Sequence, residues 1–155
     1  MPDFPSTVSG EHLLDAHIDL AAPEQIGAGP FGRRTVYIAT GGSFEGPKLR
    51  GTARPGGGDW LLSFVDYSEL DVRATLETHD GALLYITYRG VLKLSDEVTA
   101  RIGRGEDVSA SQYYFRTTPR FETGSESYAW LNSTVCVGYG WFAPGKVAYR
   151  IFAIT

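Results

Sequence analysis

The chain has 155 residues, 19 of them glycine, and its net charge of −4 comes from interspersed acidic and basic residues. This length predicts one domain, and the mixed charge offers no basic surface for nucleic acid and no polybasic segment for a membrane. The single cysteine, Cys136, excludes an intramolecular disulfide, and no leader or apolar span is seen, which predicts a cytoplasmic protein.

Strand patterns dominate the first half of the chain. Residues 1–10 are expected to form a loose tail, and residues 11–155 a single domain. Strands are predicted over residues 12–20, 34–40, 59–66 and 69–78, where β-branched and aromatic residues are frequent. Residues 23–32 are interpreted as a turn-rich connection, residues 48–54 as a short mixed segment, and residues 55–58, Pro-Gly-Gly-Gly, as irregular.

The second half contains the one predicted helix. Asp80-Gly81 predicts a type I′ hairpin turn into a return strand over residues 82–94. Ser95 is a candidate cap for a short helix that ends at Gly103. Strands are predicted again over residues 113–124, 128–142 and 146–154. Roughly eight to ten strands then predict an all-β fold, a single small antiparallel up-and-down β-barrel or strongly curled sheet.

Several common kinds of site are not supported by the sequence. Residues 46–60 are rich in glycine, but they lack the Gly-Lys-Ser/Thr of a phosphate loop. The three histidines, His12, His17 and His79, are scattered, so no metal site is predicted. No Gly-x-Ser-x-Gly elbow for a serine hydrolase is present.

The strand over residues 69–78 collects charges on one face. Asp71, Arg73 and Glu77 alternate with Leu70, Val72, Ala74 and Leu76. If the charged face points outward, it forms cross-strand ion pairs of about 0.2–1 kcal/mol each. If it points into a barrel, it lines a binding or acid/base site. The pattern alone leaves both interpretations open.

Four segments of the chain resemble one family. TGGSFEGPKLRGTARPGGGDW, LDVRATLETHDGALLYITYRG, YYFRTTPRFETGSESYAWLN and VAYRIFAI are similar, in this order, to the domain of unknown function 3237 family, also called uncharacterised protein family 0311. The resemblance runs from about His12 to the C-terminus. It implies a calycin-like barrel related in shape to lipocalins, and an activity like that of related cofactor-free cyclases. Because it covers the charged strand, we expect Asp71, Arg73 and Glu77 to point inward.

The resulting hypothesis is a cofactor-independent isomerase, lyase or cyclase that acts on an aromatic or polyketide-like molecule. Asp71 or Glu77 is the expected general acid or base, with Arg73 or Arg116 orienting the carboxylate or stabilising an oxyanion. The expected ligand-binding residues are Trp60, Asp59, Tyr88, Tyr114, Glu122, Trp130 and Asn132.

Two other hypotheses stay open. One is a non-catalytic carrier or sensor of a small hydrophobic molecule, which needs the same cavity but no acid or base near the ligand. The other is that the aromatic residues form a homo-oligomer interface. No cofactor, metal, nucleic acid or membrane partner is expected.

Overall fold

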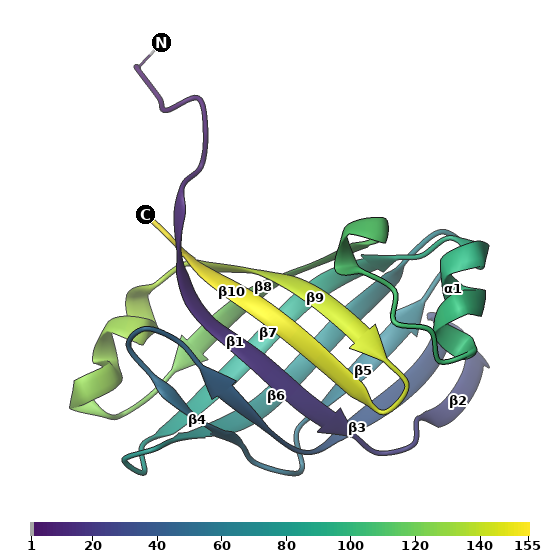
Figure 1. The fold of residues 1–155 in the computed structure, drawn as a ribbon, viewed down its shortest axis with the longest axis horizontal. Helices are drawn as coiled ribbons and strands as arrows, with labels where there is room; N and C mark the ends of the chain where they lie inside the picture. The colour runs from purple at the N-terminus through teal and green to yellow at the C-terminus, as the bar shows by residue number, and fades with distance from the viewer. Residues whose placement is uncertain (1) are drawn as a thin grey trace.

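Ten antiparallel strands form one sheet that closes on itself into a barrel (Figure 1) in the computed structural model, which describes residues 2–155. The expected all-β barrel is therefore confirmed. In chain order the strands are β1 (Gly10–Leu20), β2 (Glu24–Gly29), β3 (Gly32–Glu45), β4 (Arg50–Ala53), β5 (Gly58–Ser63), β6 (Ser68–Thr78), β7 (Leu83–Lys93), β8 (Tyr114–Glu122), β9 (Cys136–Ala143) and β10 (Lys146–Ile154).

The barrel closes where β1 pairs with β10 on one side and with β3 on the other. This closure requires a glycine at one point of close backbone approach. Gly42 of β3 lies opposite Ile18, and a Cβ atom at residue 42 would overlap the carbonyl oxygen of His17. A side chain there would push β3 away from β1, so Gly42 lets the two strands pair.

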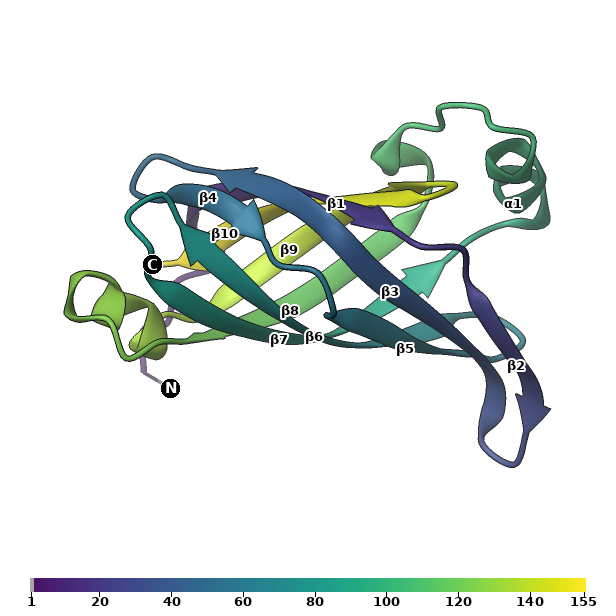
Figure 2. The same cartoon turned by 90° about the horizontal axis from the view of Figure 1, so that it is seen from below.

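Short helices lie at both ends of the barrel. The α-helix α1 (Asp96–Gly103) lies at one end, and the 3₁₀-helix η2 (Glu126–Ser133) lies at the other (Figures 1 and 2). As predicted, Ser95 caps α1, because its Oγ accepts a hydrogen bond from the backbone N–H of Val98 at 3.2 Å. A further 3₁₀-turn, η1 (Ala110–Gln112), precedes β8.

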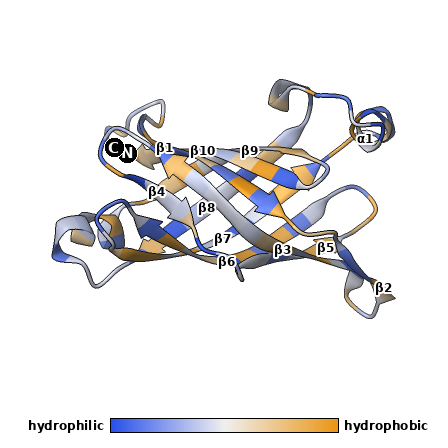
Figure 3. Cartoon of the chain, turned by 60° about the horizontal axis from the view of Figure 1, so that its bottom comes forward, coloured by the Kyte–Doolittle hydropathy of each residue, from blue (hydrophilic) through white to orange (hydrophobic). Residues whose placement is uncertain are grey.

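The alternation of side chains decides what lies inside the barrel. Hydrophobic and hydrophilic residues alternate along many of the strands (Figure 3). The interior includes Leu14, Leu84, Phe121 and Leu131, each almost completely buried. Burying such a side chain contributes about 1.5–3 kcal/mol, so these residues supply much of the stability that holds the closed sheet together.

Three local predictions are wrong. Residues 23–32 are not only a connection: they contain β2, an edge strand that pairs with β3 alone. Residues 128–142 do not form one strand, because η2 occupies their first part and β9 begins at Cys136.

The turn at Asp80-Gly81 also differs from the prediction. A type I′ turn needs positive φ at both central residues, but among residues 2–155 only glycines have positive φ, including Gly81 at 88°. The backbone N–H of Gly81 donates to the carbonyl of Thr78 at 2.9 Å, which makes a longer turn with glycine in the left-handed position. The hairpin between β6 and β7 forms nevertheless.

No helix of residues 2–155 has the length and hydrophobicity that a membrane span requires.

Candidate functional site

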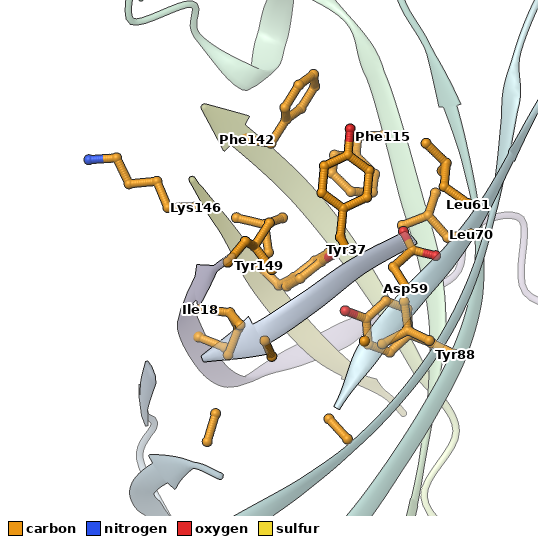
Figure 4. A pocket seen from close by; sticks show the side chains of 18 of the residues that line it. Ile18, Tyr37, Asp59, Leu61, Leu70, Tyr88, Phe115, Phe142, Lys146 and Tyr149 are labelled. Atoms are coloured by element: carbon orange, nitrogen blue, oxygen red, sulfur yellow. The ribbon is translucent and has the colours of Figure 1, made fainter. Parts of the chain in front are cut away.

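A cavity of about 350 Å³ lies inside the barrel. Leu20, Pro23, Ile102 and the β9–β10 turn at Pro144–Lys146 line it at the end that α1 occupies. Aliphatic and aromatic side chains make up nearly all of its wall (Figure 4). Apolar cavities of this size, with a few polar groups, are typical of small-molecule sites.

Asp59 is the carboxylate that lines this cavity. It lies on β5, opposite Tyr37 of β3 and Val72 of β6. Asp59 and Leu61 face the cavity, whereas Trp60 between them does not line it. The period of two along a strand therefore turns the carboxylate inward and the indole outward.

The surroundings of Asp59 favour its protonated form. Burial raises the pKa of its carboxyl from 3.8 to about 6, although a hydrogen bond from the backbone N–H of Asp71, at 3.0 Å, opposes this shift. The charge of Asp71 raises the pKa further, and that of Arg34 lowers it. A carboxyl group with a pKa near 6 exchanges a proton readily close to neutral pH.

Three tyrosines line the same cavity as this carboxylate: Tyr37, Tyr88 and Tyr149 (Figure 4). The rings of Tyr88 and Tyr149 meet edge to face, with centroids 5.2 Å apart. Burial raises the pKa of all three hydroxyls, and the negative charge of Asp59 adds to each shift. The hydroxyls therefore keep their protons at physiological pH and are available as hydrogen-bond donors.

The combination suits proton transfer in a largely apolar environment. A carboxylate that is a base near neutral pH lies beside hydroxyls that stabilise negative charge on oxygen. No group of three or more His, Cys, Asp or Glu side chains within residues 2–155 has an arrangement that would hold a metal ion. The polar side chains that line the cavity are thus Asp59, the three tyrosines and Lys146, which lies at the end near α1.

The expectation that the charged face of β6 points inward is wrong. Its apolar residues line the cavity instead: Leu70, Val72, Ala74 and Leu76. Asp71 lies outside between Arg73 and Arg89, at 3.5 and 3.4 Å, and Glu77 pairs with Arg54 at 3.0 Å. Water solvates these charges on the outer face, whereas the apolar interior would leave them without that solvation.

The other residues predicted for the site lie in different places. Asp59 and Tyr88 line the cavity as expected of ligand-binding residues. Arg116 stacks on the outer face against Tyr139 and Tyr114, with its Cζ 3.9 and 5.0 Å from the ring centroids.

Four more of the predicted residues lie away from the cavity. Trp60 contacts Arg73 on the outer face, and Glu122 is exposed at the end of β8. Trp130 lies in η2 under Lys48. Asn132 makes two hydrogen bonds with the backbone of Thr123, at 2.8 and 2.9 Å, which fixes the loop before η2.

Sequence reasoning missed Tyr37 and Tyr149. Each lies among inward-facing apolar residues, such as Ala39 near Tyr37 and Ile151 near Tyr149. A tyrosine in the buried period of a strand is a weak signal, because its ring packs in a core as well as in a site. Asp59 is a stronger signal of a site, because it is a carboxylate on the same face of β5 as the apolar Leu61.

Comparisons with known proteins place the chain in a family. A family described as "Protein of unknown function (DUF3237)" matches residues 8–154. A UPF0311 protein of Rhodopseudomonas palustris is 36% identical over 121 residues, which are 77% of either chain.

Two solved structures share the barrel. A β-barrel-like protein of Acinetobacter baumannii has a TM-score of 0.82 at 32% identity, with 98% of this chain and 99% of that chain covered. A structure described as an enzyme from Penicillium herquei has a TM-score of 0.72 at 19% identity, with both chains fully covered at 100%. At 19% identity, the likeness to the Penicillium herquei structure shows a common fold and nothing more.

Proposed function

The chain belongs to the DUF3237 family, as its motifs predict, and we propose that it binds a small apolar molecule in the barrel and catalyses proton transfer on it without a cofactor. The reaction class is isomerase, lyase or cyclase, and the substrate is aromatic or polyketide-like. The general acid/base in this proposal is Asp59, because it is the carboxylate that lines the cavity.

One observation carries the proposal: an ionisable carboxyl group with a pKa of about 6 faces an apolar cavity. Burying a carboxylate in such a place costs stability, and its raised pKa reflects that cost. Groups with such perturbed pKa values in clefts are frequent at functional sites.

The proposed chemistry begins with the removal of a proton from carbon next to a carbonyl. The C–H bond breaks, the proton moves to the Asp59 carboxylate, and the electron pair moves onto the carbonyl oxygen. Hydroxyls of Tyr37, Tyr88 or Tyr149 donate hydrogen bonds to that oxyanion. In a β,γ-unsaturated ketone the electron pair then returns from oxygen, the carbon–carbon double bond shifts into conjugation with the carbonyl, and Asp59 returns the proton to the γ-carbon, which completes an isomerisation.

Related outcomes need the same groups. If the enolate expels a leaving group, the reaction is that of a lyase. If a substrate hydroxyl is deprotonated by Asp59 and attacks an electrophilic carbon of the same molecule, a ring closes. Holding the ends of one molecule together favours such closure without an added cofactor. The Penicillium herquei enzyme shows that a protein of this barrel fold is described as an enzyme.

The test is exchange of the carbon-bound protons of β-tetralone for deuterium in D₂O, followed by NMR. We expect the wild-type protein to accelerate exchange, and the variant Asp59→Asn to reduce the rate to that of buffer. Asp66→Asn is the matched control, because Asp66 is exposed in the β5–β6 turn. Equal rates for Asp59→Asn and wild type would refute the role of Asp59.

The carrier hypothesis gives a different result in the same experiment. A carrier binds β-tetralone in the cavity but leaves its exchange rate at the buffer value. Binding of β-tetralone is measured separately by calorimetry. Asp59→Asn should still bind it, because this variant retains the apolar wall. Saturable binding without any acceleration by the wild-type protein would favour the carrier over the enzyme.

A further inference from the structure

Asp59 lies part of the way along the cavity, and the cavity continues past it. Val72 of β6 is the strand partner of Asp59, and β6 then runs on to Leu76, whose side chain also lines the cavity. The four steps from Val72 to Leu76 span about 13 Å at roughly 3.3 Å per residue. β6 then leads to Thr78, whose hydroxyl donates a hydrogen bond to Asp80. Asp80 also accepts a hydrogen bond from the hydroxyl of Tyr128 in η2. The continuation is therefore on the side of the cavity away from α1.

We call this continuation the inner chamber. Its wall is formed by the cavity-lining residues that follow Asp59 toward η2 on the surrounding strands: Leu14, Ala53, Ala74, Leu76, Ile86 and Ile151. All six are aliphatic. Within the described part of the chain, no ionisable side chain lines the cavity on this side of Asp59. Two of the six, Ala53 and Ala74, are alanine, and the other four are leucine or isoleucine.

We propose that the substrate carries an unbranched apolar arm that passes Asp59 and ends in the inner chamber. This inference deepens the proposed function and rests on it, because it takes Asp59 as the place of reaction. The reacting group then lies inside the length of the molecule rather than at its inner tip. The substrate class is an elongated ketone with an alkyl arm.

The chemistry of the wall excludes a polar arm. A hydroxyl or carboxylate in the inner chamber would lose its hydrogen bonds to water and find no side-chain partner there. Water itself is held poorly by an apolar chamber without polar partners. Each methylene that enters instead contributes about 0.8 kcal/mol, so an alkyl arm stabilises the complex in proportion to its length.

A homologous series of ligands tests the arm. Straight-chain methyl ketones from butanone to tridecanone are titrated into the protein by calorimetry. For wild type we expect the affinity to rise about fourfold per methylene until the chamber is full, and then to level off. In Ala74→Leu, a larger side chain occupies the chamber, so the affinity levels off at a shorter ketone.

The control is a matched substitution on the same strand. Thr75 follows Ala74 on β6 and does not line the cavity, so Thr75→Leu adds a leucine outside and keeps the wild-type limit of length. If Ala74→Leu fails to fold by circular dichroism, Ala53→Leu fills the chamber from β4 instead. An affinity that is independent of length, or a limit that neither chamber variant shortens, overturns the inference.

One further measurement tests this inference independently of the proposed function. Asp59→Asn leaves the inner chamber unchanged, so it keeps the length limit while it loses catalysed exchange. A normal length limit in a wild-type protein that does not accelerate exchange would contradict the catalytic proposal alone. Catalysed exchange without any dependence of affinity on length would contradict the arm alone.

Discussion

The backbone N–H of Asp71 donates a hydrogen bond to Oδ1 of Asp59, 3.0 Å away. One residue therefore contributes to both sides of the barrel wall. Its side chain lies outside with Arg73 and Arg89, while its main chain holds the carboxylate inside. In the proposed function, the acid/base group of this strand pair is therefore Asp59 of β5, and β6 supplies the backbone donor that positions it.

The first prediction concerns stability and pH. Asp59 has a folded pKa of about 6 and an ordinary value of 3.8, so its ionisation destabilises the fold as pH rises through this interval. Near neutral pH the loss is about 3 kcal/mol, at roughly 1.4 kcal/mol per pKa unit, and below about pH 4 it is absent. Asp59→Asn should therefore be more stable than wild type near neutral pH and similar to it near pH 4.

Urea unfolding at the two pH values measures this difference. Asp66→Asn, which removes an exposed carboxylate, serves as the control and should change little at either pH. A variant Asp59→Asn that is less stable than wild type near neutral pH would show that the carboxylate stabilises the fold.

The second prediction concerns the pH dependence of catalysis. A base must be ionised before it can take a proton, so kcat/KM for β-tetralone exchange should rise with pH and level off above about 6. The rate is measured with the buffer reaction subtracted. A decrease of kcat/KM through the same interval would instead assign Asp59 as an acid in the rate-limiting step.

The third prediction concerns the tyrosine hydroxyls. Tyr149→Phe removes a donor from the cavity and keeps the ring that packs against Tyr88. Loss of one oxyanion donor typically lowers kcat by about 10²–10³. We expect a loss of at least tenfold in exchange rate, with a smaller change in ketone affinity.

Tyr85→Phe is the control for this loss. Tyr85 is on β7 like Tyr88, but it is exposed on the other face, so the exchange rate should stay unchanged. An equal effect of both substitutions would mean that the loss does not come from the cavity.

The fourth prediction concerns barrel closure. Gly42→Ala places a methyl group against the carbonyl of His17, where β1 and β3 meet, and should destabilise the protein by more than about 3 kcal/mol. Gly29→Ala is the control, since the nearest atom to its Cβ would be 3.9 Å away. Thermal unfolding followed by circular dichroism compares the two. Equal melting temperatures would mean that closure does not depend on this contact.

Much of the fold follows from local patterns. The period of two predicts β6 and the range of β10, and Ser95 marks the start of α1. The sequence of β6 does not tell which of its two faces points into the barrel, because the charged and the apolar residues alternate with the same period of two. It depends on which face of the closed sheet lies inside, and closure is a property of pairings distant in sequence, such as β1 with β3.

The site was predicted in part for the same reason. Asp59 and Tyr88 are among the expected ligand-binding residues, whereas the cluster of charges on β6 favours a catalytic assignment to that strand. Charged residues gather on the outer face because water solvates them there. A functional carboxylate in an apolar cavity stands alone, so it is less conspicuous in sequence than an ion-pair network.

The most direct test of this account is the titration of Asp59 itself. Carbon-13 NMR of the labelled carboxyl groups, with the signal assigned by its loss in Asp59→Asn, follows ionisation as pH changes. We expect a midpoint near 6, and a further rise when an apolar ketone fills the cavity and excludes water. A midpoint near the ordinary value of 3.8 that the ketone does not move would contradict the assignment of Asp59 as the acid/base group of this cavity.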